Sequence, residues 1–325
     1  MNNILNDIYY DKEYIALYLK KNEQIFEFFF QEGDNIFSNI SIKRPINSIG
    51  KVNLKETFFD LETAYGYGGV FCNTNDKVFL KEAENKYIQK CLDEHIIAEF
   101  SRIHPFNTSQ ENFDSFYDLL IKDRQTISVD STLSKEERWL KYPSKIRTIL
   151  RKCAKELTFE KTDDLSSFIT LYEMTMSKNN ASDFYYFDEH YFTSLLKIKD
   201  VELYIVKQAE NIIAASFFMF GSEIGHYHLS ANDYDFRKFN GNYFILDSIF
   251  DIAKDKGIKH FHLGGGRTNA EDDLLLRFKT KFSPIKKEFY LGGKIFNNSK
   301  FSEYIDIWKQ QHDTDIPYFL KYRLP

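Results

Sequence analysis

The sequence of 325 residues contains only three cysteines, six prolines and 14 glycines, and it has no long apolar run. Cys72, Cys91 and Cys153 are odd in number and widely spaced, without a CxxC pair, so they indicate neither a disulfide framework nor a zinc site. No window approaches the roughly 18 apolar residues of a membrane span, and the N-terminal sequence MNNILNDIYYDKEY is polar and acidic, unlike a signal peptide. These absences predict a cytoplasmic protein without a membrane span.

The chain also lacks low-complexity segments and any linker rich in proline, glycine or serine. Its hydrophobic content of 43%, with 32 Phe and 21 Tyr, excludes a disordered protein. Because hydrophobic cores rarely grow beyond roughly 250–300 residues, two subdomains that pack together are favoured over a single one.

Basic residues gather in two segments of an otherwise acidic chain. Residues 134–161 hold nine Lys or Arg against four Glu, and residues 277–294 hold six against one, whereas the formal net charge of the whole sequence is −5. The acidic remainder argues against general nucleic-acid binding, and we expect no DNA partner. The two basic segments suit local binding of one phosphorylated ligand, although solvated helix and strand faces would look the same.

The predicted elements follow a similar order in the two halves. The first half reads as a hairpin over 24–44, the glycine-rich sequence DLETAYGYGGV at 60–70, a helix over 76–93 and a strand over 95–105. The second half reads as a helix over 165–177, a hairpin over 201–220, a strand over 226–231, a helix over 243–256 and a strand over 259–263. Tyr65 lies 162 residues before Tyr227, and Ile96 lies 162 before Ile258, which suggests a duplicated α/β unit. We expect one subdomain over residues 1–155 and a second over 156–300, with residues 301–325 returning to the first.

A basic helix is predicted between the halves, over residues 134–156. Its apolar positions share one face, whereas lysines occupy the opposite side. Ser134 and Glu137 have the spacing of a capping box. Pro143 is expected to kink or restart the helix.

Residues 226–282 combine a polar strand, a basic loop, a helix, a second strand and a glycine run. The loop, RKFNGN, precedes a helix N-terminus, where successive backbone N–H groups attract phosphate. An ordinary polar helix cap is the alternative. The second strand stops at three glycines, where backbone can approach a ligand or another segment closely. The residues expected to bind a phosphate-containing donor substrate are Arg237, Lys238, Asn240, Gly241, Asn242, Gly264, Gly265 and Gly266.

Two side chains are the candidates for catalysis. Lys279, in the sequence FKTKF, can pair with phosphate or with the negative charge of an acyl-transfer transition state, from either a strand face or a helix end. His228 is a candidate general base. His226 and His228 share one strand face and His260 shares another with His262, but no carboxylate with ligand spacing accompanies either pair, so we expect no metal site.

The glycine-rich segment of the first half offers a wall for a sugar or a peptide. Tyr65 and Tyr67 alternate with glycines, including Gly68, and aromatic faces suit sugar C–H surfaces. A glycine-rich turn with core tyrosines is the alternative.

The strand, loop, helix and strand of residues 226–263 resemble the core of GNAT acyltransferases. Six blocks in order are similar to the Fem-type aminoacyltransferases and their polysaccharide-associated relatives, between Asp60 and Phe282: YGYGG, EFSRIHP, residues 126–130 with the helix that carries Arg147 and Arg151, residues 185–187, HYHLSA, and HLGGG with FKTKF. Asn240 and Asn242 stand where the usual GNAT loop has small residues. The resemblance implies an α/β (α+β) fold with tandem GNAT-like subdomains, whose mixed central sheets are flanked by helices. It also implies site roles for Lys279, Tyr65, Tyr67, Arg147 and Arg151. Tyr186 is a further candidate for the acceptor site, and the alternative is that residues 185–187 fill core.

The expected function is amide formation, by transfer of an aminoacyl or short acyl group onto a primary amine of a cytoplasmic cell-envelope precursor. We expect no tightly bound cofactor, and the donor is either an aminoacyl-tRNA or an acyl-CoA. The acceptor is a muropeptide or an amino sugar, linked to a nucleotide or a lipid, and a lipid-linked acceptor implies peripheral membrane contact. Two alternatives are an acetyl-CoA-dependent N-acetyltransferase of an amino sugar, and a noncatalytic binder of nucleotide-sugars or RNA with a degenerate acyltransferase fold.

Overall fold

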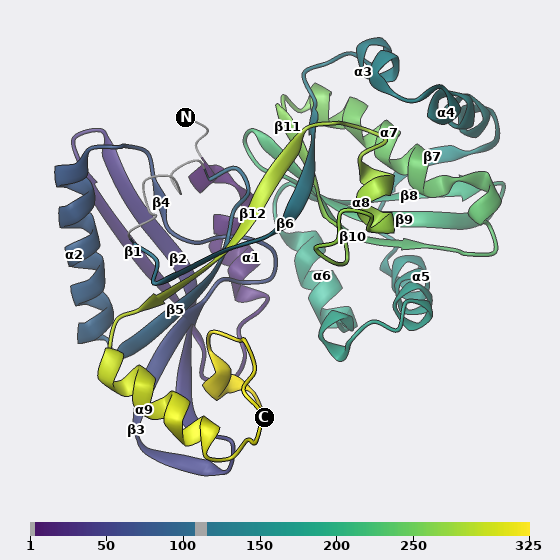
Figure 1. Ribbon diagram of the computed structural model, residues 1–325. Helices are drawn as coiled ribbons and strands as arrows, with labels where there is room; N and C mark the ends of the chain where they lie inside the picture. Colours follow the sequence, from purple (N-terminus) through teal and green to yellow (C-terminus); the bar gives the residue numbers. More distant parts are fainter. Residues whose placement is uncertain (1–3, 108–115) are drawn as a thin grey trace. The chain divides into compact units, whose positions relative to one another are not determined.

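The computed structural model describes residues 4–107 and 116–325, and its tertiary contacts divide the chain into two compact units (Figure 1). Unit 1 comprises the described residues of Met1–Leu5, Tyr9–Asp123 and Glu288–Pro325, and unit 2 comprises Asn6–Ile8 and Arg124–Lys287. The chain passes from unit 1 to unit 2 inside strand β6 (Leu119–Asp130) and returns inside strand β12 (Lys286–Ile295). The division between Asp123 and Arg124 lies upstream of the one expected from the sequence, which fell between residues 155 and 156.

Unit 1 is built on a mixed sheet in the order β1-β2-β3-β5-β12. Neighbouring strands are antiparallel except β3 and β5, which run parallel and are joined through helix α2. The predicted hairpin is confirmed, because β1 and β2 pair in register from Gln24 with Lys43 to Glu32 with Asn35. The strands are β1 (Gln24–Glu32), β2 (Asn35–Ile49), β3 (Val52–Glu62), β4 (Phe71–Cys72), which pairs with β2, and β5 (Ile96–Ile103).

Helices cover both faces of the sheet of unit 1. Helix α2 (Lys77–Asp93) buries Phe79, Ala83, Tyr87 and Cys91, a spacing of four residues that keeps one helix face on the sheet. The Asp76 carboxylate caps its first turn. Helix α9 (Asn298–Lys309) packs in a separate hydrophobic cluster, together with residues near the C-terminus of the chain. The short helices α1 (Lys12–Ala16) and η6 (Lys321–Arg323) also belong to unit 1, whereas η1 (Ile4–Asn6) ends and η2 (Ile8–Tyr10) begins with a residue assigned to unit 2.

The strands of unit 2 form a mixed sheet region in the order β6-β11-β10-β9-β8-β7. Helices α4 and α7 pack on one face, and α5 and α6 lie on the other (Figure 1). The strands are β7 (Thr158–Thr162), β8 (Val201–Gln208), β9 (Asn211–Phe220), β10 (Ile224–Asn232) and β11 (His260–Gly265). The helices are α3 (Lys135–Lys141), α4 (Ser144–Glu156), α5 (Leu165–Lys178), η4 (Asp183–Tyr185), α6 (Glu189–Lys197), η5 (Arg237–Phe239), α7 (Gly241–Asp255) and α8 (Leu274–Lys279).

The parallel strands β10 and β11 pair only at their beginnings. Their pairing covers three residue pairs and ends at His226 and His262. Beyond this point β10 continues along β9 and β11 continues along β6, each with a register shift. The backbones beyond His226 and His262 therefore do not pair with each other, and α7 is the crossover that connects the two strands.

The basic helix over residues 134–156 is two helices. The capping box of Ser134 and Glu137 is present at the start of α3, as predicted. Helix α3 ends at Lys141, and α4 begins directly after Pro143, so the proline restarts the helix rather than kinking it. The buried residues of α4 join the core of unit 2 beside α7, which places α4 in unit 2.

The tandem mixed α/β architecture predicted from the sequence is present, because both units join two parallel strands through a helix. Helix α7 ends 162 residues after α2, and β11 ends 162 residues after β5, which agrees with the anchor at Ile96 and Ile258. The other anchor is wrong, because Tyr65 lies after β3 whereas Tyr227 lies within β10. Among the described residues, no helix has both the length and the apolar character needed to cross a membrane.

Candidate functional site

Lys279 is the last residue of α8, which agrees with the helix-end alternative for FKTKF. Its side chain is only 6% exposed, and Nζ donates to the carbonyl oxygen of Gly265 at 2.7 Å. The ring of Tyr227, on β10, has its centroid 6.0 Å from Nζ. Burial lowers the pKa of Lys279 to about 7, and the nearby Asp273 carboxylate opposes this shift in part. Lys279 can therefore exchange a proton near neutral pH.

Asp273 ties the glycine run to the helix that carries Lys279. One carboxylate oxygen caps α8 by accepting from the N–H groups of Leu275 and Leu276, each at 2.9 Å. The other accepts from the N–H groups of Arg267 and Thr268, each at 3.1 Å. These bonds lower the pKa of Asp273 against the opposing effect of its burial, so the group is a carboxylate at neutral pH.

The three glycines lie where β11 leaves its pairing with β10. Gly264 has φ of +73°, a conformation that favours glycine, and a Cβ at Gly266 would lie 2.5 Å from the Asp273 side chain. Two of the glycine carbonyl groups accept hydrogen bonds from side chains. The Gly265 carbonyl accepts from Lys279, and the Gly266 carbonyl accepts from Arg124 at 3.2 Å.

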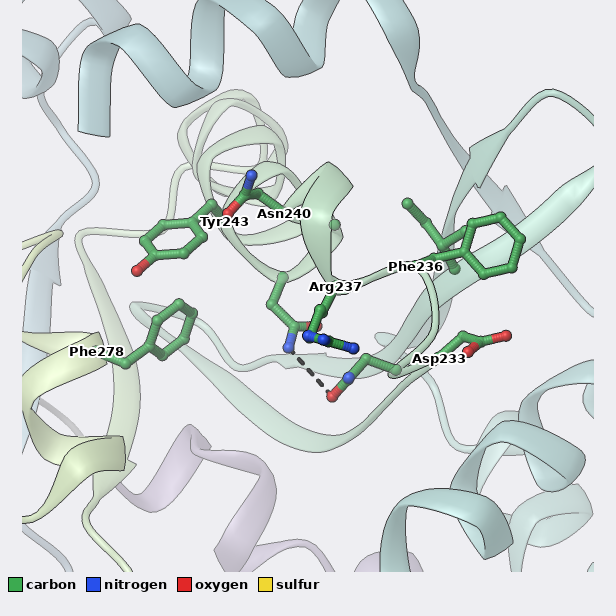
Figure 2. Close-up of a pocket in the computed structure, with 10 residues that line it drawn as sticks. Asp233, Phe236, Arg237, Asn240, Tyr243 and Phe278 are labelled. Atoms are coloured by element: carbon green, nitrogen blue, oxygen red, sulfur yellow. Dashed lines mark hydrogen bonds between the residues drawn. The ribbon is translucent and has the colours of Figure 1, made fainter. Parts of the chain in front are cut away.

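A pocket of about 160 Å³ lies at the N-terminus of α7 (Figure 2). It brings together four of the residues predicted to hold a donor, Arg237, Asn240, Gly241 and Asn242. Its other lining residues are Ile213, Asn232, Asp233, Phe236, Tyr243 and Phe278. The predicted donor residue Lys238 is exposed beside it, with Nζ 5.1 Å from the centroid of the Phe239 ring.

The backbone geometry at this pocket explains the residue types at positions 240 and 241. Asn240 has φ of +59° and caps α7 in the left-handed region, which asparagine tolerates better than other residues with a Cβ. Asn240 therefore adopts the left-handed backbone conformation that a glycine could also adopt at this position. A Cβ on Gly241 would lie 3.1 Å from the Ala214 Cβ and 3.2 Å from Ile213, so glycine allows the helix to begin against β9.

Side chains fix the pocket from several directions. Asn242 donates to the Asn232 side chain at 3.2 Å, which ties the first turn of α7 to the end of β10. The Arg237 guanidinium lies 4.2 Å from the centroid of the Tyr234 ring. On the opposite side, Tyr243 and Phe278 pack edge to face with centroids 4.9 Å apart, which joins α7 to α8 (Figure 2).

His228 lies away from Lys279. Its Nε2 is 3.2 Å from the Tyr191 hydroxyl on α6, whereas Tyr227 packs toward the core that contains α7. Consecutive residues of a strand point to opposite faces, so the two candidate catalytic side chains lie on opposite faces of β10. Burial, with a smaller effect of His226, lowers the pKa of His228 to about 3, which makes its imidazole a weak base. Both findings argue against His228 as the general base predicted from the sequence.

The predicted acceptor residues of unit 1 form one turn after β3. The Gly68 N–H donates to the Arg102 carbonyl at 2.8 Å, and the Gly68 carbonyl accepts from the His104 N–H at 3.0 Å. The Tyr65 carbonyl accepts from the Tyr14 hydroxyl at 2.8 Å. The Tyr67 ring packs edge to face with three aromatic rings, at centroid distances from 5.2 to 5.8 Å, those of Tyr9, His104 and Phe289. Both tyrosines nevertheless keep part of their surface exposed.

The other predicted acceptor residues belong to unit 2. Arg151 lies over Trp139, with its guanidinium carbon 5.7 Å from the ring centroid, and Arg147 donates to the Trp139 carbonyl at 3.5 Å. These two arginines therefore share one contact residue. Tyr186 follows η4 and its side chain is 46% exposed.

Sequence reasoning missed Asp273 and Tyr227 as neighbours of Lys279. Asp273 had a usable signal, because an aspartate directly before the apolar run LLL is a typical helix N-cap. Tyr227 and the pocket residues Asn232 and Phe278 had no local signal, since their position depends on strand pairing and helix packing.

Comparisons with known proteins agree with this architecture. Residues 141–279 match the model of the family described as "Acetyltransferase (GNAT) domain", a range that begins at the end of α3 and ends at Lys279. No curated protein matches the sequence. The crystal structure of FemX is similar with a TM-score of 0.70 at 13% identity, over 90% of this chain and 93% of that chain.

Two further structures share the fold. The C-terminal domain (DUF2156) of an Agrobacterium fabrum protein assigned as a lysylphosphatidylglycerol synthetase has a TM-score of 0.55 at 15% identity, over 85% of each chain. The structure of L-PGS from Bacillus licheniformis has a TM-score of 0.50 at 16% identity, over 87% of this chain and 88% of that chain. The chain is thus similar in sequence to a GNAT acetyltransferase domain over residues 141–279, and it has a GNAT-like fold.

Proposed function

We propose that this protein is an N-acyltransferase that moves an aminoacyl or short acyl group onto a primary amine of a cell-envelope precursor on the cytoplasmic side of the membrane. The observation that carries the proposal is the buried Lys279, held at the end of β11 by Gly265 within the region similar to a GNAT acetyltransferase domain.

Lys279 acts on the charge that develops during acyl transfer. The acceptor amine attacks the carbonyl carbon of the donor, a C–N bond forms, and the carbonyl oxygen becomes an oxyanion. The protonated Lys279 stabilises that oxyanion, because an ammonium in a poorly solvated environment interacts strongly with a nearby negative charge. The C–O or C–S bond to the leaving group then breaks, and the leaving group takes up the proton that the amine loses.

The donor binds at the N-terminus of α7. The amides that begin this 15-residue helix and the guanidinium of Arg237 favour a phosphate group in the adjoining pocket. Both an aminoacyl-tRNA and an acyl-CoA present phosphates and an activated acyl group. Lys238 and the glycines 264–266 complete the donor site. The donor is a substrate that is used up in each turnover, so the proposal includes no tightly bound cofactor.

The acceptor is a nucleotide-linked or lipid-linked amine, either a muropeptide or an amino sugar. Within unit 1, Tyr65, Tyr67 and Gly68 are candidates for a wall that binds a sugar or a peptide. Within unit 2, Arg147, Arg151 and Tyr186 are separate candidates for binding an anionic or aromatic group. The similarity to FemX and to a protein assigned as a lysylphosphatidylglycerol synthetase supports an envelope acceptor.

A donor test with matched variants checks the proposal. Charged tRNA and acetyl-CoA are offered side by side with UDP-linked amino sugars and muropeptides, and acylated product is measured by mass spectrometry. Lys279→Ala is expected to abolish product formation with either donor, whereas Lys286→Ala, at an exposed lysine, retains it. Circular dichroism verifies that both variants are folded. Full activity of Lys279→Ala would refute the catalytic assignment.

A second candidate is an acetyl-CoA-dependent N-acetyltransferase of an amino sugar, which the name of the matched family favours. It predicts thermal stabilisation by coenzyme A and activity that survives ribonuclease. Use of aminoacyl-tRNA instead predicts activity that ribonuclease abolishes and binding that weakens with salt. A noncatalytic nucleotide-sugar or RNA binder would bind these ligands without forming product in any of the assays.

A further inference from the structure

The exposed face of α4 is strongly cationic. Between Arg138 and Glu156 the chain contains no acidic residue. Ile146, Leu150 and Cys153 are buried and fix which face of the helix meets the core. The face opposite to them therefore points to solvent, and its exposed basic residues are Lys145, Arg151, Lys152 and Lys155.

The lysines of α2 in unit 1 have a different environment and provide an internal comparison. Lys81 pairs with Glu84 at 3.7 Å, and Lys86 pairs with Glu82 at 3.1 Å. Glutamates of the same helix thus pair with both Lys81 and Lys86.

On α4, by contrast, the only ion pair found within residues 4–107 and 116–325 joins Lys152 to Glu156 at 3.9 Å. Lys145 and Lys155 have no acidic partner within the same ranges. The positive charge of α4 is therefore largely uncompensated, which favours a polyanionic partner.

An exposed leucine lies directly before this cationic face. Leu140, near the end of α3, has 77% of its surface exposed, and it is followed by the exposed Lys141 and Pro143. An apolar side chain beside several lysines suits the surface of a lipid bilayer, because the lysines meet the head groups while the leucine enters the acyl boundary.

We propose that the surface formed by Leu140, Lys141 and the lysines of α4 docks on anionic phospholipid membranes. The apolar face of α4 is packed into the core of unit 2, so the helix lies on the head groups and does not insert. This docking goes beyond the proposed function and holds for any acyl donor.

The observations favour a lipid surface over RNA. Single-stranded RNA is commonly held by aromatic side chains that stack on its bases. The nearby aromatic ring of Trp139 is only partly exposed, and it has cationic groups of Lys135 and Arg151 at 5.8 and 5.7 Å from its centroid. Leu140 offers no contact that RNA phosphates require.

Sedimentation with vesicles tests the docking surface. The full chain is mixed with vesicles of equimolar phosphatidylglycerol and phosphatidylcholine, or of phosphatidylcholine alone. We expect binding to the anionic vesicles at about 0.1 M salt and release at about 1 M, where the Debye length falls from about 10 to about 3 Å. Lys145→Ala with Lys152→Ala is expected to lower the partition coefficient about 30-fold.

Two further variants separate the interpretations. Lys81→Ala with Lys86→Ala removes the same charge from α2 and is expected to leave vesicle binding unchanged. Leu140→Ser is expected to lower vesicle binding several-fold. Absence of binding to anionic vesicles at low salt, equal losses in both lysine variants, or unchanged vesicle binding by Leu140→Ser overturns the proposal. Binding of polyuridylate through the α4 lysines without vesicle binding assigns the surface to RNA and overturns it as well.

Discussion

Burial of Lys279 predicts a pH-dependent stability for unit 2 that a single substitution should remove. Its pKa falls from the ordinary 10.5 to about 7, because the ammonium is poorly solvated at this site. Above pH 7 the folded chain releases this proton, whereas the unfolded chain retains it up to about pH 10.5. Stability therefore rises between pH 7 and 10.5, and the full cost of burying the charge is present below pH 7.

The magnitude follows from the same shift. A tenfold change in proton affinity corresponds to 1.36 kcal/mol, so the charge costs about 5 kcal/mol at pH 6. Lys279→Met removes the charge and also the hydrogen bond to Gly265, which contributes about 1 kcal/mol. The variant should be more stable than the wild type by up to about 4 kcal/mol at pH 6, and this advantage should disappear as the pH approaches 10.5.

Urea unfolding at several pH values measures this difference. The chain has two tryptophans, Trp139 in unit 2 and Trp308 in unit 1, so a Trp308→Phe background makes the fluorescence report on unit 2. Lys286→Met, at an exposed lysine, serves as the control and should show no pH-dependent difference from its parent. A difference between Lys279→Met and its parent that stays constant from pH 6 to 9 would refute the reasoning.

Three other substitutions test local features of the fold. Asp273→Ala removes the cap of α8 and should lower the free energy of unfolding by about 1–2 kcal/mol and also lower turnover, whereas Asp273→Asn keeps the cap and should lose less stability in urea unfolding. Asn240→Ala should cost about 1 kcal/mol, because alanine is disfavoured at a φ of +59°, and Asn240→Gly should cost nothing by the same measurement. Asp60→Asn should lower the thermal midpoint of unit 1 strongly and cost about 3–5 kcal/mol, because the buried carboxylate pairs with Arg44 at 2.8 Å and with Arg323 at 2.8 Å. A loss below 1 kcal/mol would contradict this last expectation.

Features with local causes could be predicted from the sequence. The hairpin from Gln24, the capping box at Ser134 and the restart at Pro143 follow from alternation, side-chain caps and the missing N–H of proline. The helix and strand order of residues 226–265 was predictable for the same reason. Lys279 was predicted as a catalytic candidate because of its cationic side chain, whereas the sequence did not decide between a strand and a helix end for FKTKF.

Features that depend on strand pairing could not be predicted. The boundaries of the units lie inside β6 and β12, where nothing in composition marks them, because the same strand continues across each boundary. His228 and Lys279 lie 51 residues apart, and only the pairing and packing of β10 show that they lie on opposite faces of that strand. The anchor at Tyr65 and Tyr227 failed for a related reason, since an equal offset between two residues does not place them in equivalent elements.

The cost of burying Lys279 is itself an argument for its function. A methionine of similar length would fill the same space beside Tyr227 without desolvating a charge, and the hydrogen bond to Gly265 offsets only about one fifth of the cost. Packing alone therefore does not account for a lysine at this position. A cation that is unfavourable in the folded protein becomes favourable when a negative charge forms beside it, as it does on the acyl oxygen during amide formation. The same desolvation that destabilises the fold at pH 6 would then increase the stabilisation of the transition state, which links the stability measured for Lys279→Met to the activity lost by Lys279→Ala.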